Sequence, residues 1–222
     1  MIEVDGLAIR AVAFDMDGLM FDSERVAIEL WRSAGRAEGW DIPDHLLLGL
    51  VGHSSAEGRR LLVGSLGSSF PYDEVRARRL SLEAEYYLEN PVPLKPGLIE
   101  LLDGLARAGV PLAVATSTTR PRVLPLMKKA GILERFDFLI CGDEVEKPKP
   151  DPEIYLKAIT RLGVKPAACL VLEDSLAGVA AAHAAGAPIL MVPDVIEPDR
   201  KARAMATKIF ASLTEVRKYL RI

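Results

Sequence analysis

Two aspartates that directly follow an apolar run constrain this 222-residue chain more than any other feature. The run Ala11-Val12-Ala13-Phe14 stops at Asp15, and Asp17 comes after a single intervening residue. A strand that is apolar throughout is typical of a parallel sheet covered on both faces. Such sheets bind their ligands beyond the carboxyl ends of the strands. The sequence therefore predicts a parallel sheet with a carboxylate site at one edge.

The hydrophobic pattern changes character twice along the chain. After the first strand it is helical from Ser23 to about Asn90, and beyond Pro91 to Pro93 strands and helices alternate. This order predicts an α/β fold, a Rossmann-like doubly wound parallel sheet core with an all-helical cap inserted after the first strand. We expect the core to comprise residues 1–18 and 92–222. The cap would comprise residues 19–91, with a flap at 19–24 and cap helices over about 23–90.

Individual elements follow from the same pattern. The expected strands lie at residues 9–14, 112–115, 138–141, 169–172, 189–192 and 208–210. The expected helices of the core lie near residues 98–105, 122–130, 153–162, 176–185 and 212–220. The main cap helices are expected at residues 23–39, 44–50 and 73–89.

Polar residues follow three of these strands. Asp15 and Asp17 follow the first, Thr116-Ser117 the second, and Glu173-Asp174 a later one, with Lys147 between the last two groups. Four carboxylates at one edge would repel one another unless a divalent cation and a lysine offset their charge. Hard oxygen ligands without nearby His or Cys favour Mg²⁺. Mg²⁺, a lysine and a hydroxyl together suit a phosphoryl group.

Composition and charge exclude several other classes. The net charge of -3 offers no electrostatic case for nucleic acid or an anionic membrane. No segment approaches 18 uncharged apolar residues, and no leader pattern precedes the first strand. Cys141 and Cys169 have neither metal-ligand spacing nor a disulfide framework. We expect a cytoplasmic, monomeric protein with a small phosphorylated metabolite as its partner, and with no nucleic acid or membrane partner.

Four segments resemble, in order, the motifs of the haloacid dehalogenase superfamily, subfamily I, in its branch of β-phosphoglucomutase-like and sugar-phosphate phosphatases. The four segments are Asp15-Met16-Asp17-Gly18, Ala115-Thr116-Ser117, Lys147-Pro148-Lys149-Pro150-Asp151 and Glu173-Asp174-Ser175-Leu176-Ala177-Gly178. They span nearly the whole chain. A lone Asp-x-Asp would occur often by chance, but the ordered set of four would not.

The resemblance implies a role for each carboxylate. Asp15 would be the nucleophile that forms an aspartyl-phosphate. Asp17 would be the general acid that protonates the leaving alkoxide and then the base that activates water. Mg²⁺ would be held by the Asp15 carboxylate, the Asp17 backbone carbonyl and Asp174, with Glu173 acting directly or through water.

The resemblance also implies the phosphate contacts. Thr116, the Ser117 backbone and Gly18 would contact phosphate, and Lys147 would balance the charge between Asp15 and the phosphate. The spacing of Lys147 from Asp151 selects it over Lys149, which we interpret as a solvated neighbour. Taken alone, Thr116 and Ser117 would be better explained as the N-terminal cap of a helix after a strand.

Substrate choice would depend on the cap. β-Phosphoglucomutases carry a histidine at the position of Ala27 and an arginine near Ser55, and both are missing here. Their absence favours hydrolysis over the mutase alternative, and His53 is a candidate substrate contact. The dehalogenases that attack carbon lack the second aspartate of the first motif and the acidic metal pair. Asp17 and Asp174 therefore point to phosphate esters.

The expected function is therefore a Mg²⁺-dependent phosphatase of small phosphorylated metabolites, such as sugar or polyol monophosphates. A phosphosugar mutase is the alternative. A receiver-like phosphoacceptor domain also clusters aspartates, a hydroxyl and a lysine at a sheet edge, but the helical insertion and Asp17 argue against it. A binding protein without catalysis on the same fold is disfavoured by the intact set of motif residues.

Overall fold

A computed structural model describes residues 1–51 and 55–222, so the interpretation of His53 as a substrate contact lies outside the described residues. The chain forms two compact units. One joins Met1–Asp22 to Pro93–Ile222, and the other is Ser23–Val92. Residues 19–22 group with the first unit and Val92 with the second, whereas residues 19–22 were expected in the cap and residue 92 in the core.

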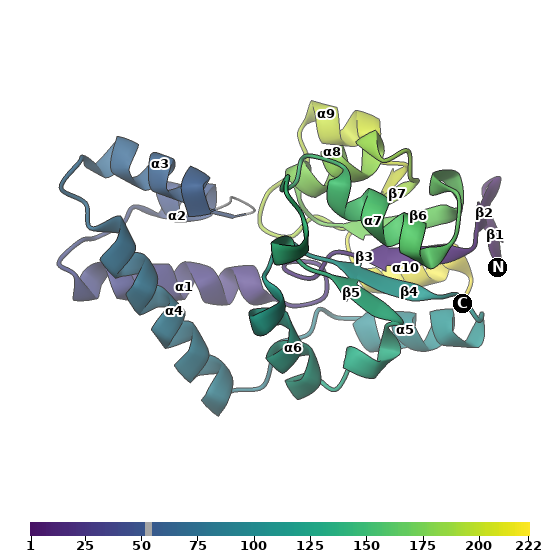
Figure 1. Cartoon of the computed structure of the whole chain (residues 1–222), viewed down its shortest axis with the longest axis horizontal. Coiled ribbons are helices and arrows are strands. Elements are labelled where there is room, and N and C mark those ends of the chain that lie inside the picture. The colour runs from purple at the N-terminus through teal and green to yellow at the C-terminus, as the bar shows by residue number, and fades with distance from the viewer. Residues whose placement is uncertain (52–54) are drawn as a thin grey trace. The chain divides into compact units, whose positions relative to one another are not determined.

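The first unit is built on a parallel sheet of six strands in the order β5-β4-β3-β6-β7-β8 (Figure 1). The strands are β3 (Ala11–Phe14), β4 (Leu112–Ala115), β5 (Phe138–Ile140), β6 (Cys169–Glu173), β7 (Ile189–Met191) and β8 (Lys208–Ile209). The chain winds outward from β3 first to one side and then to the other, which is the doubly wound arrangement. The predicted fold class is confirmed.

Helices cover both faces of this sheet, as Figure 1 shows. They are α5 (Leu98–Arg107), α6 (Arg120–Lys129), α7 (Glu153–Leu162), α8 (Leu176–Ala184), α9 (Arg200–Met205) and α10 (Leu213–Leu220). Ala11 and Ala13 of β3 pack in one core cluster with buried residues of α7 and α8. Successive side chains of a strand point to opposite faces. On the other face, Phe14 contacts Phe136 edge to face at 5.6 Å between ring centroids.

The register of the central strands brings the three polar segments to one edge. Phe14 of β3 is paired with Val114 of β4 and with Leu172 of β6. All three strands run in the same direction, so the residues that follow them leave the sheet at the same end. The buried apolar strands thus position the polar groups that come next in the sequence.

The second unit is a small helical bundle. It contains α1 (Ser23–Ala37), α2 (Asp44–Gly49), α3 (Ser55–Leu66) and α4 (Tyr72–Glu89). Its own core includes Leu47, Leu62 and Val75, and Trp31 and Trp40 pack against that core. The Trp40 ring meets Phe70 edge to face at 5.3 Å between centroids. The insertion therefore has a hydrophobic core of its own.

A hairpin and a helix were not predicted. A hairpin of β1 (Ile2–Val4) and β2 (Leu7–Ile9) precedes the sheet, so the expected strand at 9–14 divides between β2 and β3. Its turn is formed by Asp5-Gly6, and both residues have positive φ. An Asp-Gly pair is a sequence signal for a two-residue hairpin turn. Helix α9 was also missed, although Asp199 caps it by accepting a hydrogen bond from the Ala202 N–H at 2.7 Å.

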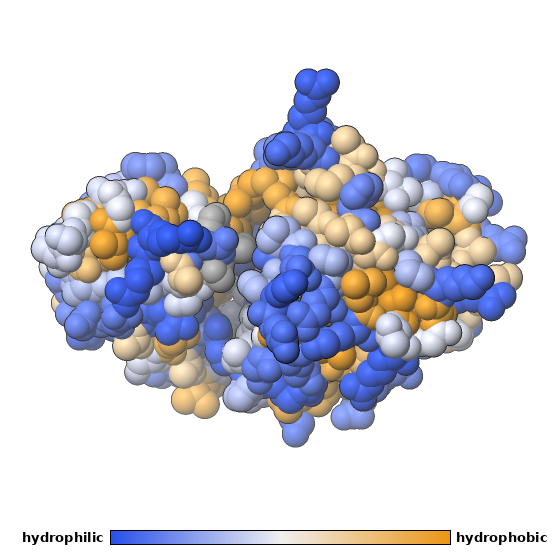
Figure 2. Space-filling model, turned by 45° about the horizontal axis from the view of Figure 1, so that its top comes forward, coloured by the Kyte–Doolittle hydropathy of each residue, from blue (hydrophilic) through white to orange (hydrophobic). Residues whose placement is uncertain are grey.

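The surface carries few large apolar side chains. Among the described residues, Met1 and three leucines from three different helices are exposed, namely Leu48, Leu88 and Leu156. In the view of Figure 2, hydrophobic and hydrophilic residues are intermingled on the surface. Within the part of the chain that the structure describes, no helix is both long and apolar enough to cross a membrane.

Candidate active site

A buried lysine, Lys149, lies at the centre of the carboxylate site. Only 5% of its side chain is exposed. Its Nζ lies 2.5 Å from Asp15 Oδ1 and 2.7 Å from Glu173 Oε1. It also donates to the Ala115 carbonyl at 3.0 Å and lies 3.0 Å from the Tyr155 hydroxyl. One ammonium group thus links the carboxyl ends of β3, β4 and β6.

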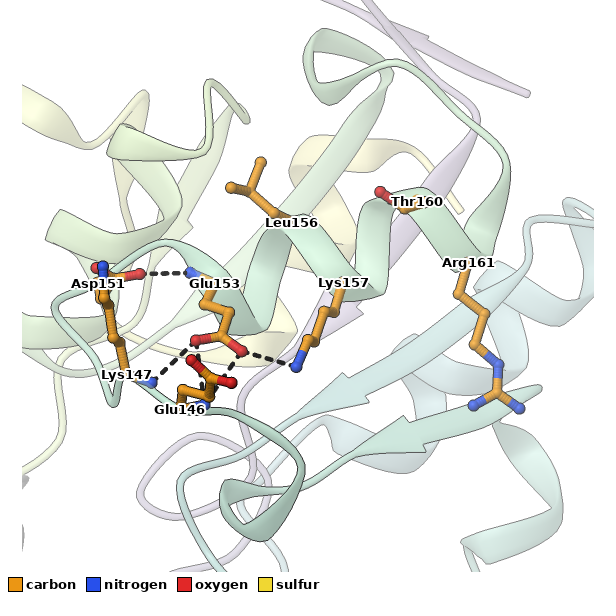
Figure 3. Close-up of a pocket in the computed structure, with 8 residues that line it drawn as sticks. All are labelled: Glu146, Lys147, Asp151, Glu153, Leu156, Lys157, Thr160 and Arg161. Atoms are coloured by element: carbon orange, nitrogen blue, oxygen red, sulfur yellow. Dashed lines mark hydrogen bonds and ion pairs between the residues drawn. The ribbon is translucent and has the colours of Figure 1, made fainter.

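The selection of Lys147 for this position was wrong. Lys147 is exposed, and its backbone N–H donates to Glu153 Oε2 at 2.9 Å. Figure 3 shows it beside Glu146 and Glu153, lining a pocket on the outer side of α7. The Lys-Pro-Lys-Pro run offers two registers, and only the second carries its lysine inward. Lys149, which was interpreted as a solvated neighbour, is the buried one.

Glu173 orients this lysine. It is fully buried, and its Oε1 accepts from Lys149 and from the Tyr155 hydroxyl at 2.6 Å. Its Oε2 accepts from the backbone N–H groups of Asp174 and Ser175 and from the Ser175 hydroxyl, each at 3.0 Å. Five donors therefore occupy its two oxygens. Glu173 therefore orients Lys149 and adds negative charge to the site, while its direct ligation of a metal stays a prediction.

Tyr155 completes the lysine's surroundings. Burial, and next the charges of Glu173 and Asp15, raise the pKa of the Tyr155 hydroxyl well above its ordinary value. The hydroxyl therefore stays protonated and donates to Glu173. The Lys149 ammonium also lies 4.8 Å from the centroid of the tyrosine ring, within range of a cation–π contact.

An acidic triad at this site could hold a divalent metal. Among the described residues, Asp15, Glu173 and Asp174 each offer a carboxylate oxygen within 4.8 Å of the other two. All three are buried. Three carboxylates against one lysine ammonium leave two negative charges, which a divalent cation would neutralise. Hard oxygen donors are the ligands that Mg²⁺, Ca²⁺ and Mn²⁺ prefer, so the residues present fit such an ion.

The charge balance is also visible in the Asp15 carboxyl group. Burial raises the pKa of Asp15 to about 7, against the opposing effect of Lys149 and with a further increase from Glu173. The pKa of Lys149 is raised, because attraction to Asp15 and Glu173 outweighs the lowering by burial. A bound cation would favour the ionised carboxylate and lower the Asp15 pKa.

Gly18 leaves room for Asp174. It has a φ of +83°, a conformation that side chains rarely adopt. A methyl group at this position would lie only 2.2 Å from Asp174 Oδ2. The glycine therefore allows the loop after β3 to pack directly against the third carboxylate. Its predicted contact with phosphate stays a prediction.

The loop that follows β4, which carries Thr116, Ser117 and Thr118, contacts Asp17. Thr116 is buried, and its Oγ1 accepts from the Thr118 N–H at 3.1 Å. The Thr118 hydroxyl in turn donates to Asp17 Oδ2 at 2.7 Å. Ser117 is exposed at the tip of this loop. The loop that carries Thr116 and Ser117 thus meets the carboxylate site through Thr118. The contacts of Thr116 and Ser117 with phosphate stay predictions.

Tyr155 and Thr118 were not predicted as site residues, and Lys149 was considered but assigned to solvent. The signal for Tyr155 was present, because it shares the apolar face of α7 with Ile154 and Ala158. A tyrosine on a fully buried face needs a polar partner for its hydroxyl. For Thr118 the signal was weaker, since a hydroxyl three residues after a strand is a common loop residue.

A scan against protein-family models matches residues 9–186 to the haloacid dehalogenase-like hydrolases. The chain belongs to this family. It is 34% identical to the protein CbbY of Rhodobacter capsulatus, over 84% of this chain and 86% of the relative. It is 33% identical to a phosphorylated carbohydrates phosphatase of Thermotoga maritima, over 80% of this chain and 82% of the relative.

A solved structure shows the same architecture. The crystal structure of CbbY from Rhodobacter sphaeroides in complex with phosphate superposes with a TM-score of 0.78 at 28% identity. The match covers 96% of this chain and 100% of that chain. Because the match covers nearly the whole of both chains, it includes the helical insertion of this hydrolase.

Gly178 provides the first prediction for this hydrolase. A methyl group there would lie 1.6 Å from Glu173 Oε1, whose carboxylate is held by five donors and cannot move aside. Gly178→Ala should lower the free energy of unfolding by ~1–3 kcal/mol through overpacking, although alanine favours the helix. Denaturant unfolding measures the change. Gly64→Ala, in α3 with open space around it, should instead stabilise by ~0.5–1 kcal/mol.

Metal binding gives a second prediction, which does not depend on activity. A saturating divalent cation, added as Mg²⁺ or Mn²⁺, should stabilise the folded protein by ~3 kcal/mol at a hundred times its dissociation constant. Asp174→Asn should abolish most of this gain in thermal unfolding. The matched control is Asp103→Asn, on α5 and 43% exposed, which should keep it. Equal cation responses in the two variants would contradict the assignment of Asp174.

The two lysines allow a direct comparison. Lys149→Met should lower the free energy of unfolding by ~3–5 kcal/mol, because it leaves buried carboxylates without their partner. Lys147→Met should change it by less than ~0.5 kcal/mol, as expected for an exposed side chain. Urea unfolding at pH 8, where the carboxylates are ionised, measures both. Similar stabilities for the two variants would show that the buried lysine is not needed to offset the acidic site.

Proposed function

We propose that this hydrolase is a Mg²⁺-dependent phosphatase that acts through an aspartyl-phosphate. The observation that carries the proposal is the Lys149 ammonium held 2.5 Å from Asp15 and 2.7 Å from Glu173, beside the carboxylate of Asp174. The named phosphatase among the relatives supports it. The finer assignment of Mg²⁺ rests on the all-oxygen donor set and the charge left uncompensated within the triad.

In the first half-reaction, an Asp15 carboxylate oxygen attacks phosphorus. The ester P–O bond breaks, and its electron pair goes to the leaving alkoxide, which takes a proton from Asp17. Lys149 keeps the attacking carboxylate in place and offsets charge on the phosphoryl group. Mg²⁺, when bound, would supply the remaining positive charge for the phosphoryl oxygens.

In the second half-reaction, Asp17 takes a proton from water as that water attacks the aspartyl-phosphate. The bond between phosphorus and the Asp15 oxygen breaks, which releases inorganic phosphate and restores the carboxylate. Thr116 and the backbone at Ser117 would bind phosphoryl oxygens throughout. Because the Asp17 carboxyl group takes part in both proton transfers, it must keep its position from the first step to the second.

We propose sugar or polyol monophosphates as the substrate class, with the helical insertion acting as the cap. The T. maritima relative, named for phosphorylated carbohydrates, supports this class. Ala27 and Ser55, which replace the histidine and arginine expected of a mutase, favour hydrolysis over phosphoryl transfer between sugars. The expectations of a monomer and a cytoplasmic location stay predictions.

The nucleophile assignment gives the central prediction. Asp15→Asn should retain less than about a thousandth of the wild-type rate, because both the covalent route and the positioned carboxylate are lost. Release of inorganic phosphate from a panel of sugar and polyol phosphates with Mg²⁺ measures the effect. Asp103→Asn is the matched control and should keep the wild-type rate.

The same panel separates phosphatase from mutase. β-Glucose 1-phosphate should be tested together with glucose 1,6-bisphosphate. Free phosphate is the expected product. Formation of glucose 6-phosphate without net release of phosphate would replace the proposed activity with the mutase alternative, while a slow Asp15→Asn variant would still identify the nucleophile.

A further inference from the structure

We propose that Thr118 is a positioning residue that holds the Asp17 carboxyl group for proton transfer. The inference rests on the proposed function, in which Asp17 is the general acid and base. Its direct support is the hydrogen bond of 2.7 Å from Thr118 Oγ1 to Asp17 Oδ2. Thr118 lies outside the four family motifs.

Both backbone groups of Thr118 are hydrogen-bonded. Its N–H donates to Thr116 Oγ1 at 3.1 Å, and its carbonyl accepts from the Gly142 N–H at 3.0 Å. Gly142 packs so closely on this loop that a methyl group there would lie 2.1 Å from the Ser117 carbonyl oxygen. The amide, the carbonyl and the hydroxyl of Thr118 are therefore all engaged, so its hydroxyl has a defined position.

The loop that carries Asp17 is held in a similar way. The Gly18 N–H donates to the Phe21 carbonyl at 2.9 Å, and the Phe21 N–H donates to the Met16 carbonyl at 3.1 Å. The loops of Asp17 and Thr118 follow β3 and β4, which pair directly in the sheet. Each residue lies three positions beyond the end of its strand. Neighbouring strands thus bring the hydroxyl to the carboxyl group.

A hydroxyl is suited to this task because it both donates and accepts hydrogen bonds. It can donate to Asp17 when that group is a carboxylate, and accept from it when it is a carboxylic acid. Asp17 passes between these forms twice in each proposed turnover. A valine side chain has the shape of threonine but can hold neither form, whereas serine can hold both.

Leaving-group dependence tests this role. Phenyl phosphate and p-nitrophenyl phosphate have similar size, but p-nitrophenolate is the better leaving group and needs less help from an acid. For Thr118→Val, the ratio of kcat/KM for p-nitrophenyl phosphate to that for phenyl phosphate should rise at least ~10-fold, since general acid catalysis contributes ~100-fold or more. Thr118→Ser should keep the ratio within about twofold of wild type.

Thr119→Val is the matched control. Thr119 is the neighbouring exposed hydroxyl, and its side chain makes no capping hydrogen bond to α6. It should keep the wild-type ratio. If Thr118→Val shows no cooperative thermal unfolding, and so is not folded, Thr118→Ala removes the same hydroxyl and should show the same rise.

The outcomes separate this inference from the proposed function. An unchanged ratio in the hydroxyl-free variant, or the same rise in Thr119→Val, would overturn the role of Thr118 alone. An equal loss on both esters would indicate a binding or structural role instead, and would also overturn it. If the wild-type enzyme with Mg²⁺ hydrolyses neither ester nor any phosphate in the metabolite panel, the proposed phosphatase fails and this inference fails with it.

Discussion

The site depends on a lysine buried between two carboxylates. An isolated buried ammonium or carboxylate would be very costly, so each is stable only with the others in place. Lys149 meets Asp15 and Glu173 at hydrogen-bond distance, and Glu173 is held in turn by Tyr155 and backbone amides. The arrangement keeps a net negative charge, which favours binding of a divalent cation. A bound cation would in turn favour an incoming phosphoryl group.

Glycine makes this packing possible on two sides. Gly178 lies directly under the Glu173 carboxylate, and Gly18 lies directly against Asp174. A side chain at either place would force a charged group out of position in an interior that is already close-packed. The apolar strands supply the other half of the geometry, since their parallel pairing sends Asp15 and Asp174 out at the same edge.

The sheet was predictable because apolar strands and amphipathic helices impose strong periodic patterns. The carboxylates were predictable for a related reason, as Asp15 and Asp174 directly follow strands whose burial is unambiguous. Lys149 was not, because two Lys-Pro pairs fit the same motif and only packing decides which lysine turns inward. The bond from Thr118 to Asp17 joins two loops across a sheet, and such contacts leave no periodic mark.

The two aspartates of the opening motif are distinguished by their surroundings. Asp15 is buried and ion-paired, an environment that would fix the position of the proposed attacking oxygen. Asp17 is only half-buried and is bonded to a hydroxyl that accommodates both of its protonation states. In the proposed mechanism, the ion pair with Lys149 suits a nucleophile, and the bond to the Thr118 hydroxyl suits a group that gains and loses a proton. The loops after β3 and β4 thus give neighbouring carboxylates different environments, which suit different steps of the proposed reaction.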